Sequence, residues 1–181
     1  MRELSLNVLD IAQNSIVAGA SLTEILIKED TKEKTLLIGI YDNGKGMTDE
    51  QVRSVQDPFF TTRTTRKVGM GIPLFKMAAE QTGGYLKIES QVGVGTRVEA
   101  LFKTDSIDFT PVGNMEATIS TIVSMNEDKD FIYIRSVDDR EFTFSSAEIK
   151  QILDGVPLSE PSVIMWIEAH IKEQTDELFK N

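Results

Sequence analysis

The first eighteen residues place apolar side chains at the spacing of a helix that packs on a core. At about 100° per residue, one arc of this segment holds Leu4, Val8, Ile11 and Ala18. A neighbouring arc about 60° wide holds Asn7, Asp10 and Asn14. Gly19 is the expected stop signal, because glycine is common just past a helix end. The pattern therefore predicts an amphipathic helix over residues 3–18 with a polar edge.

Shorter apolar patterns follow and predict strands. Residues 22–27 alternate, residues 35–41 form a partly β-branched apolar run, and a charged hairpin tip joins them. Thr48 and Gln51 have the spacing of a capping box, so a short helix is expected to begin there.

A third helix is predicted from Gly69 and Gly71 to about Thr82, and Pro73 is tolerable in its first turn. Two alternating strands then cover 85–90 and 96–102. This order of helices and strands predicts an α+β fold: a two-layer α/β sandwich that consists of a mixed sheet with helices on one face.

The rest of the chain predicts a smaller unit of the same class. After a connector, we expect a helix over 114–125, a hairpin over 131–144, a short helix capped by Ser146 and an amphipathic helix over 160–179. We therefore expect two parts: residues 1–103 as the main domain and residues 104–181 as a small acidic α+β C-terminal appendage.

The charge is unevenly distributed and limits the kinds of partner. The net charge is −10; residues 1–103 contain 13 acids and 13 bases, whereas residues 104–181 contain 16 acids and 6 bases. Nucleic acid is not expected as a partner, because neutralising phosphates needs a basic face. There is no cysteine and one histidine, and no apolar run approaches the ~20 residues of a membrane span. A cytoplasmic protein without membrane contact is the expectation.

Asp42 stands at the end of a predicted buried strand and is followed by a turn that contains Gly44 and Gly46. Both glycines can take positive φ and let a ligand approach the backbone. The Asp42 carboxylate could accept a hydrogen bond from an amino group such as adenine N6. The alternative is that Asp-Asn-Gly is a hairpin turn, and this stretch alone does not decide between the two.

A basic, hydroxyl-rich loop precedes the helix that is predicted to run to Thr82. Between Asp57 and Glu80 there are four bases, four threonines and no acid. Such a loop at a helix N-terminus suits a polyphosphate. The alternative is a solvated surface loop, although solvated loops usually mix charges of both signs.

Five segments in a fixed order resemble the GHKL ATPase superfamily, the group of DNA gyrase, the heat-shock-90 chaperones, histidine kinases and mismatch-repair ATPases, whose nucleotide site is the Bergerat fold. The segments are similar to the N box at 14–20, the first glycine box at 42–47, the F box and lid entrance at 57–62, the second glycine box at 69–72 and the last Gly-Thr pair at 95–96. The resemblance covers about residues 3–103.

The resemblance implies roles for individual residues. Asn14 would ligate Mg²⁺, and Asp42 would bind the adenine amino group, with Thr96 supporting it through water. The nucleotide backbone would be admitted by Gly44, Gly46, Gly69 and Gly71. The F box and lid would bring to the phosphates Phe60, Arg63, Arg66 and Lys67. Asp10 falls where hydrolytic members have a glutamate general base, and its side chain is one methylene shorter.

Two functions with ATP or ADP and Mg²⁺ stay open. In the first, Asp10 supports phosphoryl transfer to a separate protein, or slow hydrolysis. In the second, ATP orders a lid over residues 57–71, and the protein is a non-catalytic binding switch like an anti-sigma-factor regulator. His170 lacks the surrounding pattern of a phosphoacceptor. A partner protein is expected on the acidic C-terminal part, and whether the protein is also a homodimer stays open.

Overall fold

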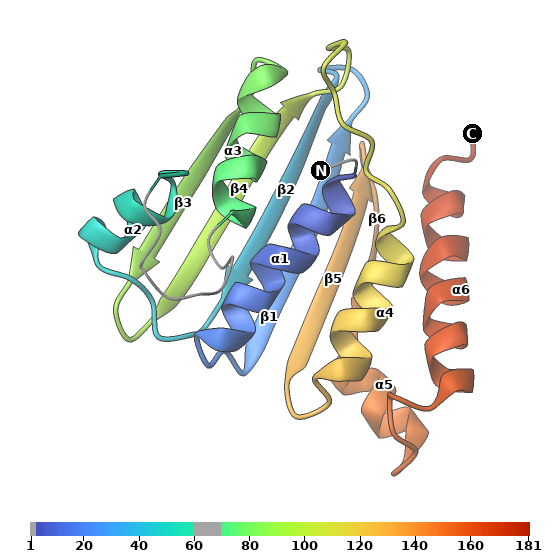
Figure 1. The fold of residues 1–181 in the computed structure, drawn as a ribbon. Helices are drawn as coiled ribbons and strands as arrows, with labels where there is room; N and C mark the ends of the chain where they lie inside the picture. The colour runs from blue at the N-terminus through green and yellow to red at the C-terminus, as the bar shows by residue number, and fades with distance from the viewer. Residues whose placement is uncertain (1–2, 60–69) are drawn as a thin grey trace.

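The computed structural model describes residues 3–59 and 70–181, and its centre is one six-stranded sheet (Figure 1). The strands lie in the order β3 (Tyr85–Gln91), β4 (Gly95–Lys103), β2 (Thr35–Asp42), β1 (Leu22–Asp30), β5 (Asp130–Val137) and β6 (Arg140–Ser145). β5 runs parallel to β1, and all other neighbouring strands are antiparallel. The predicted mixed sheet is confirmed.

Four helices form the second layer, side by side on one face of the sheet (Figure 1). In space they follow the order α3 (Gly71–Gln81), α1 (Leu4–Val17), α4 (Met115–Met125) and α6 (Pro161–Leu178). Two shorter helices flank the sheet, α2 (Asp49–Val55) beside β3 and α5 (Ser146–Leu153) beside β5. This is the α+β two-layer sandwich with helices on one face that the sequence predicted.

The core lies between the two layers because alternate strand residues face the helices. In β2, Leu36, Ile38 and Ile40 are buried, whereas the side chain of Tyr41 is on the other face and half-buried. Burying one such aliphatic side chain contributes roughly 1.5–3 kcal/mol. The predicted apolar stripe of α1 is confirmed, because Leu4, Val8 and Ile11 are all buried.

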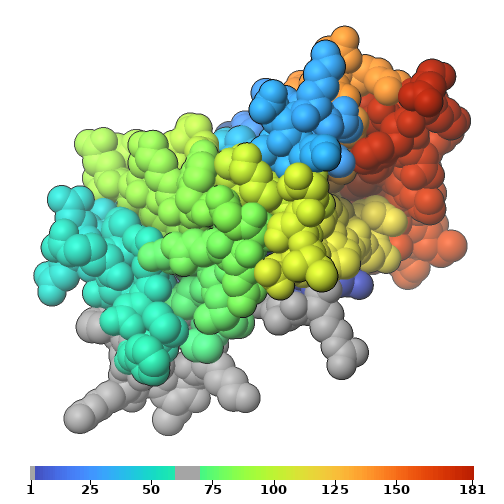
Figure 2. Space-filling view, turned by 90° about the horizontal axis from the view of Figure 1, so that it is seen from above, coloured from blue at the N-terminus to red at the C-terminus, as the bar shows by residue number. Residues whose placement is uncertain are grey.

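The C-terminal residues extend the same sheet and the same core. β5 pairs with β1 along its length, from Leu22 opposite Asp130 to Glu29 opposite Val137. The connector is bound to α1, since the backbone N–H of Leu4 donates to the carbonyl of Pro111 at 2.9 Å. Figure 2 shows this connector, in yellow, between α3 and α6. The boundary at residue 103 stays a prediction, but hydrophobic contacts run across it.

Local signals at element ends were mostly identified correctly. The capping box of α2 is present, with Thr48 and Gln51 exchanging both hydrogen bonds. The prediction that Ser146 caps α5 is wrong: Ser145 is the N-cap, and the Ser146 hydroxyl accepts from the backbone N–H of Phe131 at 2.8 Å. In the described ranges, no helix combines the length and the apolar character needed to cross a bilayer.

Candidate functional site

Seven predicted site residues gather where α1, the last residue of β2 and the first turn of α3 meet. They are Asp10, Asn14, Asp42, Gly44, Gly46, Gly71 and Thr96. The hairpin alternative for Asp42 and its glycines is wrong, because β2 pairs with β1 and β4, and the chain after Asp42 leads to α2.

Two donors orient the carboxylate of Asp42. The Ser15 hydroxyl donates to Oδ2 at 2.7 Å, and the backbone N–H of Gly44 donates to Oδ1 at 2.8 Å. Each carboxylate oxygen has further acceptor capacity beyond one such bond. Asp42 is half-buried at the edge of the core. Its carboxylate is therefore fixed in place and can still accept from an amino group.

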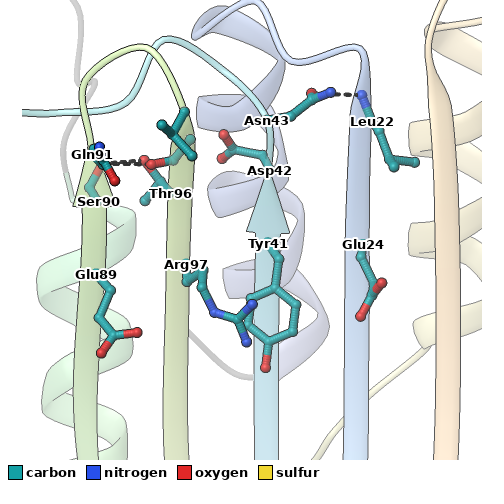
Figure 3. Close-up of a pocket in the computed structure, with 12 residues that line it drawn as sticks. Leu22, Glu24, Tyr41, Asp42, Asn43, Glu89, Ser90, Gln91, Thr96 and Arg97 are labelled. Atoms are coloured by element: carbon teal, nitrogen blue, oxygen red, sulfur yellow. Dashed lines mark hydrogen bonds between the residues drawn. The ribbon is translucent and has the colours of Figure 1, made fainter.

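Thr96 lies directly opposite Asp42 in the β2–β4 ladder. Its hydroxyl is 2.8 Å from the hydroxyl of Ser90 (Figure 3). The Ser90 hydroxyl accepts from the backbone N–H of Met47 at 2.8 Å. The hydroxyl pair ties the loop after Asp42 to the β3–β4 hairpin. Thr96 is thus beside Asp42, as its supporting role requires.

Gly44 and Gly46 are explained by contacts within the protein. A Cβ at Gly44 would lie 2.9 Å from the Cβ of Ala18, although Gly44 does not have a positive φ. Gly46 has a φ of +70°, and a Cβ there would lie 2.0 Å from the carbonyl oxygen of Gln91. The turn therefore needs glycine to pass between α1 and the β3–β4 hairpin. A role in admitting a nucleotide stays a prediction.

Asp10 lies against the beginning of α3. A Cβ at Gly71 would be 3.0 Å from the Asp10 Cβ and 3.7 Å from its Oδ2, so glycine allows the two helices to approach here. Desolvation by the surrounding protein raises the pKa of the Asp10 carboxyl above its usual range. Among the residues that the structure describes, no side chain caps the first turn of α3, and that turn contains no acidic residue. Pro73 has no backbone N–H, and that of Leu74 donates to the carbonyl of Met70 at 3.1 Å, so Gly71 and Ile72 carry the N–H groups of this turn that suit an anion.

Asn14 follows Asp10 by one helical turn, so the two side chains lie on the same side of α1, and both are exposed. Asn7, one turn earlier, is buried. No group of three or more His, Cys, Asp or Glu could hold a metal ion within residues 3–59 and 70–181. Mg²⁺ commonly takes one or two protein oxygens and completes its shell with waters and phosphates. Asn14 fits that pattern as a single protein ligand.

Five of the predicted nucleotide contacts lie outside the described residues. They are Phe60, Arg63, Arg66, Lys67 and Gly69. Their roles stay predictions.

A hollow of about 480 Å³ lies at this end of the sheet, and Asp42 and Thr96 are among the residues that line it (Figure 3). It continues onto the face of the sheet turned away from α1, where it is lined by Tyr41 and Arg97. The Arg97 guanidinium sits 4.0 Å from the centre of the Tyr41 ring, and the Tyr41 hydroxyl donates to Glu99 at 2.7 Å. Burial and the Glu99 carboxylate raise the pKa of Tyr41 to about 12. Tyr41 and Arg97 are thus the sequence neighbours of Asp42 and Thr96, but their side chains lie on the face of the sheet turned away from α1.

A family model described as "Histidine kinase-, DNA gyrase B-, and HSP90-like ATPase" matches residues 1–106, which is more than half of the 181-residue chain. The chain belongs to this ATPase family. The resemblance to the GHKL superfamily is therefore confirmed, and membership supports ATP as the ligand of the ATPase domain.

The ATPase fold is also found in a solved structure. The Aquifex aeolicus MutL ATPase domain complexed with ADP matches with a TM-score of 0.51 and 16% identity, over 85% of this chain and 70% of that one. At this identity the likeness shows the fold alone, which is the predicted Bergerat fold.

Two curated proteins, a sporulation kinase and a sensor protein, are similar to part of this chain. Sporulation kinase C of Bacillus subtilis (strain 168) is 28% identical over 100 residues, which are 54% of this chain and 23% of that protein. The sensor protein SrrB of Staphylococcus aureus (strain NCTC 8325 / PS 47) is 34% identical over 101 residues, 53% of this chain and 17% of that protein. The chain spans less than a quarter of the length of either curated relative.

Sequence reasoning missed Ser15 and Asn43. Ser15 continues the apolar stripe of α1 one turn after Ile11, and a hydroxyl at a core position is a signal that it has a polar partner. The Asn43 side chain accepts from the backbone N–H groups of Ser21 and Leu22 at 2.9 and 3.0 Å. These two hydrogen bonds hold the turn between α1 and β1 beside the end of β2. Neither the spacing nor the composition around Asn43 indicates that contact.

Proposed function

We propose that this protein binds ATP with Mg²⁺ and transfers the γ-phosphoryl group to a separate protein. The observation that carries the proposal is the position of Asp10, a carboxylate with a raised pKa beside the first turn of α3. A base is most useful when its pKa lies near the working pH, so this upward shift favours a proton acceptor.

The adenine end of the nucleotide belongs at Asp42. The adenine N6 amino group donates to the carboxylate, whose direction is set by Ser15 and by the Gly44 N–H. Thr96 lies opposite and supports a bridging water. This geometry favours an amino group over a carbonyl at that position of the base, because a carboxylate accepts hydrogen bonds and does not donate them.

The phosphate end belongs between α1 and the first turn of α3. The backbone N–H groups of Gly71 and Ile72 and the dipole of α3 favour negative charge there. Asn14 would hold Mg²⁺, which when bound neutralises charge on the phosphates. The basic residues of the sequence between 57 and 71 would add positive charge to the same end.

The transfer step uses Asp10 as the base or as the residue that orients the acceptor. The hydroxyl oxygen of the acceptor bonds to the γ-phosphorus while its proton passes to the Asp10 carboxylate. The bond from that phosphorus to the bridging oxygen breaks, and ADP leaves. Water in place of the acceptor gives slow hydrolysis. General-base assistance of this kind contributes roughly 10²–10⁴-fold in rate.

A nucleotide-dependent switch without chemistry is the second candidate. It is favoured by the contact between α1 and α4, because α1 carries Asp10 and Asn14 while α4 belongs to the acidic C-terminal part. Nucleotide binding at α1 could thereby alter the affinity for a partner at α4 and α6. We expect that partner to be a protein, in either candidate function.

Labelled ATP tests the two candidates. We expect Asp10→Asn to keep ATP affinity and to lose label transfer to proteins of a host lysate, as well as release of ADP. Asp10→Glu restores the longer side chain and raises turnover if reach is limiting. Asn14→Ala is the companion variant, which should lose Mg²⁺-dependent nucleotide affinity. If Asp10→Asn keeps full turnover while Asn14→Ala loses binding, the transfer proposal is wrong and the switch remains.

A further inference from the structure

Five large apolar side chains are exposed where α4 ends, α5 lies and α6 begins. They are between 48 and 77% exposed, and we name them the apolar end: Met125, Ile152, Val156, Met165 and Trp166. Single exposed apolar residues are normal on a protein surface. Five on three helices and the loop between two of them, at one end of the molecule, are not explained in that way.

Hydrogen bonds hold these three segments together. The backbone N–H of Ser159, before α6, donates to the Glu127 carboxylate at 2.8 Å, just after α4. The Lys150 ammonium of α5 donates to the carbonyl of Lys129 at 2.6 Å. Figure 1 shows the end of α4, α5 and the start of α6 together at the lower right of the molecule. The apolar end is therefore carried by one fixed piece of structure.

The exposure of Trp166 is not a by-product of helix packing. The buried stripe of α6 consists of Val163, Ile167 and Ile171, and it faces α4 and the sheet. Met165 and Trp166 are off this stripe, and Met165 is 71% exposed. The fold leaves about half of Trp166 and most of Met165 in water, and water around apolar side chains costs free energy.

Trp166 is held in one orientation by its own helix. Its ring stacks on His170, one turn later, with the ring centres 4.8 Å apart and the planes 7° from parallel. An aromatic side chain that is already ordered loses little rotamer entropy when a partner covers it. Tryptophan is also among the residues that contribute most to binding at protein interfaces.

Acidic residues surround the apolar end. The segments 125–130 and 146–169 contain seven acids and two lysines. Both lysines already pair with neighbouring acids, Lys129 with Asp128 at 3.4 Å and Lys150 with Asp130 at 2.9 Å. The field around the apolar end is therefore negative. A second copy of this surface, or an anionic lipid surface, would meet charge of the same sign.

We propose that the apolar end binds a basic amphipathic helix of a partner protein. Such a helix presents apolar residues at i, i+3, i+4 and i+7, and lysines or arginines at its flanks. Its apolar face covers Met165 and Trp166 while its basic flanks meet the acids. What the partner is for rests on the proposed function. The binding surface itself does not, because it needs no nucleotide.

The only tryptophan of the chain lies in the proposed contact, so its fluorescence reports on binding. The probe is a designed Leu/Lys helical peptide of about 15 residues, titrated into the full chain with and without ATP. We expect a blue shift of the emission, saturation at about 10 μM or below, and weaker binding at high salt. A peptide of the same composition without amphipathic order, and one with Glu for Lys, should bind at least about tenfold more weakly.

Variants distinguish binding of the peptide at the apolar end from general electrostatic attraction of a basic peptide to an acidic protein. With a fluorescently labelled peptide, Trp166→Ala and Met165→Ser should each weaken binding at least about tenfold. Tyr85→Ala is the matched control, since Tyr85 is 47% exposed on the opposite edge of the sheet. Asp42→Asn should keep peptide binding even where it loses nucleotide, so failure of the nucleotide site and of this surface can be told apart.

Three results would overturn the proposal. The first is an unchanged Trp166 emission at saturating peptide. The second is equal binding to Trp166→Ala and Tyr85→Ala, which would mean charge attraction alone. The third is Trp166-dependent self-association in sedimentation, or Trp166-dependent binding to vesicles of anionic lipid, which would mean a second copy or a membrane as the occupant.

Discussion

The hydroxyl of Ser15 sets the direction of the Asp42 carboxylate, because it is one of two protein donors to that group. Removing a hydrogen bond to a charged group typically costs about 1.5–3 kcal/mol, or roughly 10- to 150-fold in affinity. We expect Ser15→Ala to weaken ADP binding by this amount and Asp42→Asn to abolish it nearly completely, since the amide replaces an acceptor by a donor. Calorimetry with ADP measures both.

The control for Ser15→Ala is Ser124→Ala, which removes a serine hydroxyl that donates to the carbonyl of Thr121 in α4. It should leave ADP affinity unchanged. Equal ADP affinity of Ser15→Ala and the unmodified protein would show that the Ser15 hydroxyl does not position Asp42.

The raised pKa of Asp10 predicts a pH dependence of stability that measurements can test. A carboxyl whose pKa is higher in the folded than in the unfolded state adds stability when protonated, and this stability is lost as the pH rises through the folded value. At pH 7 the charged group therefore opposes folding. We expect Asp10→Asn to melt above the unmodified protein at neutral pH, with the difference shrinking as the pH falls toward the usual aspartate range. A constant difference across that range would contradict the shift.

At the scale of elements, Ser146 joins α5 to the sheet. It is fully buried, and its hydroxyl is the acceptor for the backbone N–H of Phe131 at the start of β5. Ser146→Ala leaves that N–H buried without a partner, which costs about 1–3 kcal/mol. Ser145→Ala removes a more exposed cap and should cost about 1 kcal/mol. Urea denaturation of the two variants gives the comparison, and an equal or smaller loss for Ser146→Ala would contradict the assignment.

Most elements could be predicted from the sequence because their residues determine them locally. The stripe of Leu4, Val8 and Ile11 and the capping box at Thr48 depend only on neighbouring residues. The choice between Ser145 and Ser146 as a cap depends on the strand opposite, which no local pattern contains. The same holds for β5, whose apolar alternation predicts a strand without indicating that its neighbour is β1.

Asp10, Asn14 and Asp42 could be named from the sequence because they lie in a recognisable order along the chain. In the structure Asp10 and Asn14 are one turn apart on α1, and Asp42 accepts from Ser15 of the same helix. Their roles stay predictions. The approach of Gly71 to Asp10 and the contact of Ser15 with Asp42 are tertiary contacts between helices and strands. Spacing in sequence could not predict the desolvation that raises the pKa of Asp10.

For the whole molecule, a core shared by both parts of the chain implies shared cooperativity. Ile25 in β1 is buried and its strand pairs with β5, whereas Trp166 lies on α6 in the C-terminal part. We expect Ile25→Ala to destabilise the protein by about 2–5 kcal/mol and to shift the Trp166 fluorescence and far-UV circular dichroism transitions equally. Separate midpoints for the two probes would mean that the parts unfold independently.

The parallel pairing of β1 with β5 has a consequence for the order in which the protein is made. Leu22 lies opposite Asp130, so 108 residues separate two partners in adjacent strands. At about 5–20 residues per second, a ribosome needs roughly 5–20 s to synthesise that stretch. During this interval β1 can pair with β2 but keeps one open edge, the kind of edge that recruits strands from other chains. The nascent chain is therefore most vulnerable to aggregation before β5 emerges, and a chaperone that covers β1 would act in that window.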